Sequence, residues 1–112
     1  MKLKTIAEKM NMKVISGSSS LDREATGGYA SDLMSDVIAN SKEGDLWVTM
    51  QIHQNIVAVA QLKELSGIII VHNRPVEAET LKKAKEAGLP IMVTELTAFE
   101  IVGKLYELGV GR

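Results

Sequence analysis

The chain contains no cysteine among its 112 residues. A disulfide scaffold, a thiolate zinc site and a cysteine nucleophile are therefore excluded. An excess of charge of one sign is also missing, because 13 Lys and Arg stand against 14 Asp and Glu, for a formal net charge of -1. Proteins that bind nucleic acid usually carry a basic excess that neutralises phosphates, so we expect no nucleic-acid partner.

Long apolar runs are absent as well. The first ten residues interrupt their apolar side chains with Lys and Glu, which is unlike a signal peptide. No run approaches the ~20 apolar residues that cross a bilayer. The Walker-type phosphate loop and the nucleophile elbow of serine hydrolases are also missing. We therefore expect a cytoplasmic protein that contacts no membrane, is not an enzyme, and has no cofactor, metal or catalytic residue.

What is present is the composition of one globular domain. The hydrophobic fraction of 46% and the charged fraction of 24% are close to ordinary globular values. This much apolar material offsets the entropy of ordering the chain, which excludes disorder. With no linker or internal repeat in the sequence, we predict a single domain over residues 1–112.

Short strands and helices alternate along the chain. The apolar patterns predict strands at 12–16, 46–50, 67–71 and 90–93, and helices at 5–10, 31–40, 55–65, 77–87 and 98–108. Helices between successive strands imply parallel pairing with right-handed crossovers. The predicted fold class is therefore α/β, a three-layer domain with a mainly parallel four-stranded sheet flanked by helices.

Two of these segments are unusually apolar. The run GIIIV at 67–71 is typical of a central parallel strand that is buried on both faces. The helix that contains Ile56 is apolar nearly all round in its first two turns. A helix of this kind should be covered on two sides, which agrees with a homodimer.

Ligands of open parallel sheets bind beyond the carboxyl ends of the strands. If all strands are parallel, the polar residues that leave them share one edge. We select nine as candidate ligand-binding residues: Asp22, Arg23, Thr26, Gly27 and Gly28 after the first strand, His53 after the second, and His72, Asn73 and Arg74 after the third. The simpler alternative is that loops are polar in any case and that capping explains some of these residues.

The loop around Arg23 allows two interpretations. An arginine can grip a phosphate or carboxylate with two hydrogen bonds, and the adjacent glycines would let the backbone approach a ligand. Alternatively, Asp22 and Arg23 pair with each other or across a subunit contact, while the glycines only permit a tight turn. The residues alone leave both interpretations open.

The stretch LDREATGGYASDLMSDVIAN resembles the DRTGG domain, named after residues that occur here as Asp22, Arg23, Thr26, Gly27 and Gly28. The resemblance continues through DLWVTMQIHQNIVAVAQLKELSGIIIV and GLPIMVTELTAFEIVGKLYELG, so it covers essentially the whole chain. DRTGG domains occur in phosphotransacetylases and in CBS-type pyrophosphatases, and they are similar to the N-terminal domain of HPr kinase/phosphorylase. The resemblance implies a regulatory module that self-associates, with the catalytic parts of such proteins elsewhere.

Two functions are consistent with these observations. The first is a stand-alone, dimeric regulatory module that recognises a nucleotide or another small anion at the carboxyl edge of its sheet. The second is a protein-interaction subunit without a small-molecule ligand, in which the loop around Arg23 docks a protein partner or the second protomer.

Overall fold

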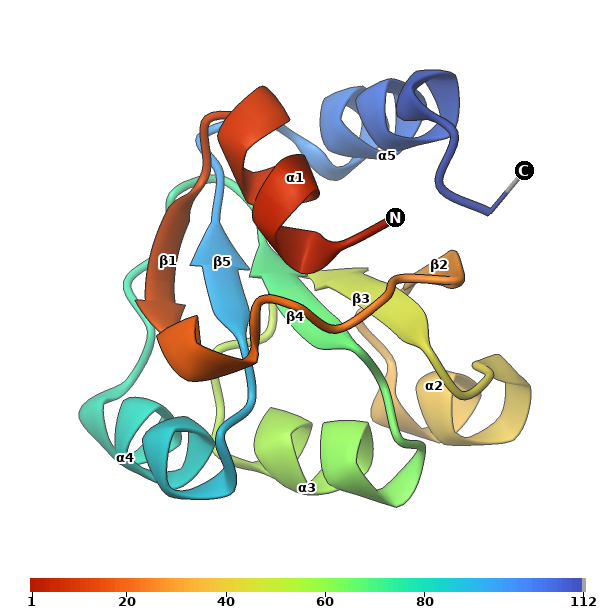
Figure 1. Cartoon of the computed structure of the whole chain (residues 1–112). Helices are drawn as coiled ribbons and strands as arrows, with labels where there is room; N and C mark the ends of the chain where they lie inside the picture. The colour runs from red at the N-terminus through yellow and green to blue at the C-terminus, as the bar shows by residue number, and fades with distance from the viewer. Residues whose placement is uncertain (112) are drawn as a thin grey trace.

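The computed structural model describes residues 1–111 and contains one five-stranded sheet (Figure 1). Its strands lie in the order β1-β5-β4-β3-β2. They are β1 (Lys13–Ser16), β2 (Gly27–Ala30), β3 (Asp45–Thr49), β4 (Gly67–Ile70) and β5 (Ile91–Val93). Strands β2 to β5 are mutually parallel, whereas β1 pairs with β5 in the antiparallel direction.

The helices form a layer on each face of the sheet. Helices α1 (Leu3–Lys9) and α5 (Ala98–Leu108) cover one face, and helices α2 (Met34–Asn40), α3 (Asn55–Leu62) and α4 (Ala78–Ala87) cover the other (Figure 1). A one-turn 3-10 helix, η1 (Ser18–Ser20), follows β1. The α/β class, the three layers and the mainly parallel sheet are therefore confirmed. No helix within residues 1–111 is long and apolar enough to cross a bilayer.

Side chains alternate across the sheet and build a separate core on each side. Ile69 and Val48 point into the core under α1 and α5. Ile68, Ile70 and Trp47 point into the core that α2, α3 and α4 cover. The three isoleucines of β4, Ile68 to Ile70, are fully buried. A strand with neighbouring strands on both sides and helices on both faces requires this.

The prediction of four strands is wrong by one. Strand β2 lies between the predicted strand at 12–16 and the predicted helix at 31–40, where no regular element is predicted. It pairs with β3 at the sheet edge, with Tyr29 opposite Trp47. The Trp47 indole Nε1 also donates to the carbonyl of Ser31, just beyond β2, at 2.8 Å. The pairing comes from contacts with β3, because the sequence GGYA has little strand propensity of its own.

The apolar helix α3 is covered on both sides within one chain. Its buried residues Ile56, Val57, Val59 and Ala60 face the sheet and the neighbouring helices α2 and α4, between which it lies. Cover on two sides, which the sequence predicted, is therefore supplied by this chain's own layer of three helices. The composition of α3 consequently gives no support to a homodimer.

Candidate functional site

The segment that carries the Asp-Arg motif crosses the sheet from one edge to the other. Residues 17–26 leave β1 at one edge and enter β2 at the opposite edge, passing the amino ends of the parallel strands (Figure 1). We call residues 17–26 the strap. Backbone hydrogen bonds hold it against the N-terminus of the chain, from Leu3 N to Arg23 O at 3.0 Å and from Ala25 N to Met1 O at 2.8 Å.

The prediction that all nine candidate residues share one edge of the sheet is wrong. Because β1 is antiparallel to its neighbour, its carboxyl end lies at the amino ends of the other four strands. Five of the nine candidates therefore lie at the amino edge, and four at the carboxyl edge. The amino edge holds Asp22, Arg23, Thr26, Gly27 and Gly28, and the carboxyl edge holds His53, His72, Asn73 and Arg74.

The two glycines of the motif lie in β2 and have different surroundings. A Cβ on Gly27 would lie 2.7 Å from Asp45 Oδ1, whereas one on Gly28 would meet only the Leu46 carbonyl at an ordinary 3.5 Å. Asp45 is buried, and its other carboxylate oxygen accepts from Lys42 N at 2.8 Å, so it is not free to move aside. Gly27 is therefore required by packing between β2 and Asp45, the first residue of β3.

Replacing Gly27 with alanine should lower the free energy of unfolding by about 1–3 kcal/mol, as overpacking of a fixed neighbour does. The matched variant Gly28→Ala should change it by less than about 0.5 kcal/mol, as a surface change does. Urea unfolding followed by the fluorescence of Trp47 measures both. Equal effects of the two substitutions would contradict a packing role for Gly27.

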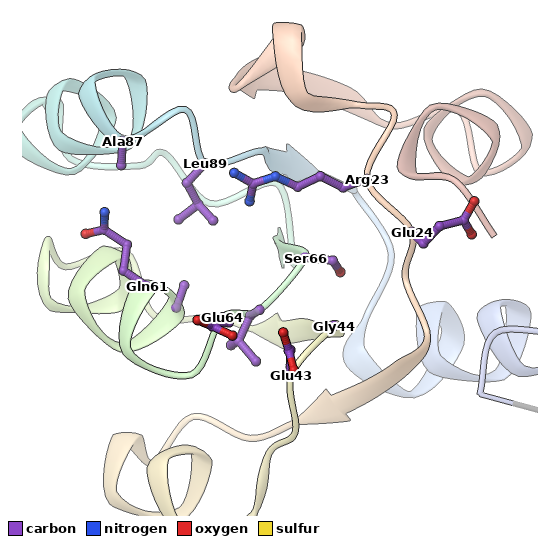
Figure 2. A pocket seen from close by; sticks show the side chains of 11 residues that line it. Arg23, Glu24, Glu43, Gly44, Gln61, Glu64, Ser66, Ala87 and Leu89 are labelled. Atoms are coloured by element: carbon purple, nitrogen blue, oxygen red, sulfur yellow. The ribbon is translucent and has the colours of Figure 1, made fainter.

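A hollow of about 640 Å³ opens beside the strap at the amino edge. Figure 2 shows Arg23 reaching into it from the strap toward Leu89, with Glu24 pointing away on the other side. The wall opposite the strap comes from the turn before β3 and the end of α3. The lining residues are Arg23, Glu24, Glu43, Gly44, Ala60, Gln61, Glu64, Leu65, Ser66, Ala87 and Leu89.

Carboxylates dominate the electrostatics of this hollow. Arg23 is the one cationic side chain among the described residues that line it, against Glu24, Glu43 and Glu64. A hydrogen bond with Glu64 raises the pKa of Glu43, and the charge of Glu64 raises it further. The pKa of Glu24 is instead lowered, first by its hydrogen bond to the N-terminal ammonium, 2.8 Å away, and then by the charge of that group. Arg23 therefore lies in a hollow of mixed charge.

At the carboxyl edge, Asp32 joins the loops after β2 and β3. Its Oδ1 accepts from Thr49 Oγ1 and from Met50 N, both at 2.8 Å. Gln51 Nε2 donates to its backbone carbonyl at 3.0 Å, and Arg74 donates from Nη1 to the carbonyl of Met50. Arg74 therefore connects the loop after β4 to the loop after β3.

The sequence analysis missed Asp32 as a residue that organises this edge. The signal that could have found it is an acidic residue directly beyond a strand, but β2 was assigned to a loop. Among the nine candidates, Arg74 is the one whose side chain takes part in this network within the described residues, through its hydrogen bond to the carbonyl of Met50. That role is a structural link between loops.

His72 and Asn73 follow the central strand in the left-handed conformation, with φ of 60° and 48°. Residues other than glycine adopt this left-handed conformation at a cost of about 1–2 kcal/mol. Their N–H groups are bonded to Leu96 O and Thr94 O at 3.0 and 2.8 Å, which holds the strained turn in place. His53 is exposed in the neighbouring loop, and no three His, Asp or Glu residues within 1–111 are arranged to hold a metal.

Comparisons with known proteins identify the family of this chain. The model of the DRTGG domain family matches residues 5–108. The chain belongs to the DRTGG domain family. The resemblance seen in the sequence is thereby confirmed, and the motif of this DRTGG domain corresponds to the strap and the first half of β2. No curated protein matches it.

A solved structure with the same fold contains a DRTGG domain next to CBS domains. It is the regulatory region of Clostridium perfringens pyrophosphatase, described as complexed with its activator, diadenosine tetraphosphate. The superposition has a TM-score of 0.74 with 13% sequence identity, and it covers 91% of this chain and 44% of the other. At this identity the likeness shows the shared fold, and this DRTGG domain spans less than half of that structure.

Proposed function

We propose that this DRTGG domain is a non-catalytic regulatory module that acts by contact with other protein surfaces, a second copy of itself included. Membership of the family supports the regulatory role, as does the place of the similar domain in the regulatory region of a pyrophosphatase. The absence of catalysis and the cytoplasmic location stay predictions. Turnover of a phosphoryl or acyl substrate that is lost on mutation of His53 or His72 would contradict a non-catalytic role.

The mixed charge of the Arg23 hollow is the observation that carries this proposal. A polyphosphate placed there would approach the carboxylates of Glu43 and Glu64 beside the one guanidinium, so like charges would oppose its binding. A polypeptide surface presents both signs of charge, which can pair with Arg23 and with Glu43 or Glu64 separately. The hollow therefore suits a protein partner better than it suits a nucleotide.

Nucleotide sensing is the second candidate. The complex of the pyrophosphatase regulatory region with diadenosine tetraphosphate favours it. In this chain the ligand would use Arg23 with Thr26, Gly27 and Gly28 at the amino edge, or His53, His72, Asn73 and Arg74 at the carboxyl edge. Because the two edges lie at opposite ends of the strands, one small ligand would not use both sets.

A thermal-shift screen against diadenosine tetraphosphate, mononucleotides and inorganic phosphate, with the mass in solution measured alongside, separates the two candidates. We expect no ligand-dependent rise in Tm and a mass above the 12.2 kDa of one chain. A true ligand at about 100 times its Kd would instead stabilise the domain by about 2.7 kcal/mol, which raises Tm by several degrees in a domain of this size.

The control is a matched pair of variants at the amino edge. Arg23→Ala removes the charge inside the hollow, and Lys2→Ala removes an exposed charge next to Asp22 outside it. A nucleotide-dependent shift that disappears in Arg23→Ala and persists in Lys2→Ala would replace protein contact with nucleotide sensing as the function.

A further inference from the structure

The Arg23 hollow continues into a groove between α3 and α4. This groove has a volume of about 410 Å³ and shares Gln61 and Ala87 with the hollow. Figure 2 shows these two residues facing each other from the two helices, next to Arg23. From there the groove follows α3 as far as Asn55, the first residue of that helix. The hollow and the groove therefore form one path along the helical face, from the amino edge of the sheet to the start of α3.

The walls of the hollow carry opposite charges that do not pair with each other. Figure 2 shows Arg23 on the side of the strap, with Glu43 and Glu64 on the opposite side. None of these three side chains forms an ion pair within residues 1–111. The two carboxyl groups lie close enough together for Glu64 to raise the pKa of Glu43, so a cation between them would relieve a repulsion. Each wall therefore keeps its charge for an incoming group of the other sign.

Carboxamide side chains line the α3 side of the groove. Gln54, Asn55 and Gln61 are exposed, and their side chains form no hydrogen bond with other described residues. Each carboxamide offers N–H donors and a carbonyl acceptor, which match the C=O and N–H groups of a peptide backbone. Ala58 lies between them on the same face of α3, and its small side chain lets a backbone come close. A helical partner would have its backbone groups bonded internally, so these amides favour an extended segment.

We propose that this path holds an extended peptide segment of a partner protein, with an acidic and a basic residue next to each other in its sequence. Successive side chains of an extended chain point to opposite sides. An adjacent acidic and basic pair therefore places its carboxylate at Arg23 and its cation at Glu43 and Glu64, on the opposite wall. The inference rests on the proposed function, in which the domain acts through contact with other proteins, and it specifies the chemistry of the partner.

The length of the groove sets the length of the segment. From Gln61 to Asn55 the helix rises about 9 Å, a distance that an extended chain covers with about three residues. The segment therefore needs about five residues, the charged pair in the hollow and three residues between α3 and α4. So short a contact should be weak and reversible, with a Kd between about 10 µM and 1 mM.

The test is an NMR titration of the isotope-labelled domain with synthetic octapeptides up to about 1 mM. The probes are Gly and Ser peptides that carry one adjacent Glu and Lys pair, in either order. We expect the tighter of the two to shift the side-chain amide signals of Gln54, Asn55 and Gln61. A control peptide with a Ser between Glu and Lys points both charges to the same wall, so it should bind at least about fivefold more weakly.

Matched variants test the two parts of the path separately. Ala58→Lys fills the groove and should raise Kd at least about tenfold. Leu62→Lys, on the same helix and 67% exposed outside the groove, should leave Kd within about twofold. Arg23→Ala should raise Kd at least about fivefold, whereas Lys2→Ala, outside the hollow, should leave it unchanged. All four positions are exposed, so the Tm of each variant should stay close to that of the original chain and show that folding is intact.

The failure of this inference and the failure of the proposed function give different results. Peptide binding that Ala58→Lys leaves unchanged, or a control peptide that binds as tightly as the adjacent pair, would overturn the extended-peptide site. No signal shift with any probe up to about 1 mM would overturn it as well. In each of these cases the proposed function would stand, because folded surfaces can also contact the hollow. A nucleotide-dependent rise in Tm that is lost in Arg23→Ala is the separate result that would overturn the proposed function.

Discussion

Replacing Ile69 with alanine should lower the free energy of unfolding by about 2–5 kcal/mol. Ile69 has an exposed fraction of 0% and lies at the middle of β4, paired to Val48 on β3 and to Met92 on β5. The cavity left by its side chain would open in the core beneath α1 and α5. Strands and helices surround this position on every side, so the core has little freedom to collapse into the space.

Urea unfolding compares Ile69→Ala with Leu62→Ala. Leu62 is 67% exposed at the end of α3, so its truncation should change stability by less than about 0.5 kcal/mol. A loss below about 1 kcal/mol for Ile69→Ala would contradict the central position of β4 in the sheet. An unchanged m value would show that the substitution acts on stability and leaves two-state unfolding in place.

Gly17→Ala should lower the free energy of unfolding by roughly 2–5 kcal/mol, the sum of a left-handed side chain and a collision with backbone. Gly17 begins the strap with φ of 68°. A Cβ there would lie 2.5 Å from the carbonyl carbon of Leu89 and against the nitrogen of Pro90. These are backbone atoms directly before β5, so neither can move without disturbing the sheet.

Gly109→Ala is the matched control for this prediction. Gly109 also has a left-handed φ, 109°, but no atom lies within 4 Å of the place of its Cβ. Its substitution should therefore lower stability by only about 1–2 kcal/mol, the contribution of backbone conformation alone. If both substitutions lower the free energy of unfolding by the same amount, the close approach of the strap to the start of β5 does not explain the effect of Gly17→Ala.

The elements with strong local signals were predictable from the sequence. The run of three isoleucines in β4 is buried on both faces as expected. The predicted start of α5 at residue 98 is also confirmed, because Thr97 accepts from Glu100 N at 3.2 Å and Glu100 accepts from Thr97 N at 3.1 Å. Such signals depend on residues within one or two turns of each other, which a sequence shows directly.

The features that the sequence did not show depend on contacts between distant residues. Gly27 and Gly28 form a strand because β3 pairs with them, and nothing in their own type favours it. The direction of β1 is likewise decided by its pairing with β5, about eighty residues away in the chain. This single direction separates Arg23 from His53 and His72, so the candidate site could not be assembled from strand ends alone.

Both outer strands of the sheet come from the first thirty residues. Strand β1 covers the free side of β5, and β2 covers the free side of β3, with the strap joining them. A chain without residues 1–30 would keep only three apolar strands, and both of its new sides would present unpaired N–H and C=O groups. Such sides are templates for aggregation. The first thirty residues therefore cover both sides of the three apolar strands and leave only the short strands β1 and β2 at the edges of the sheet.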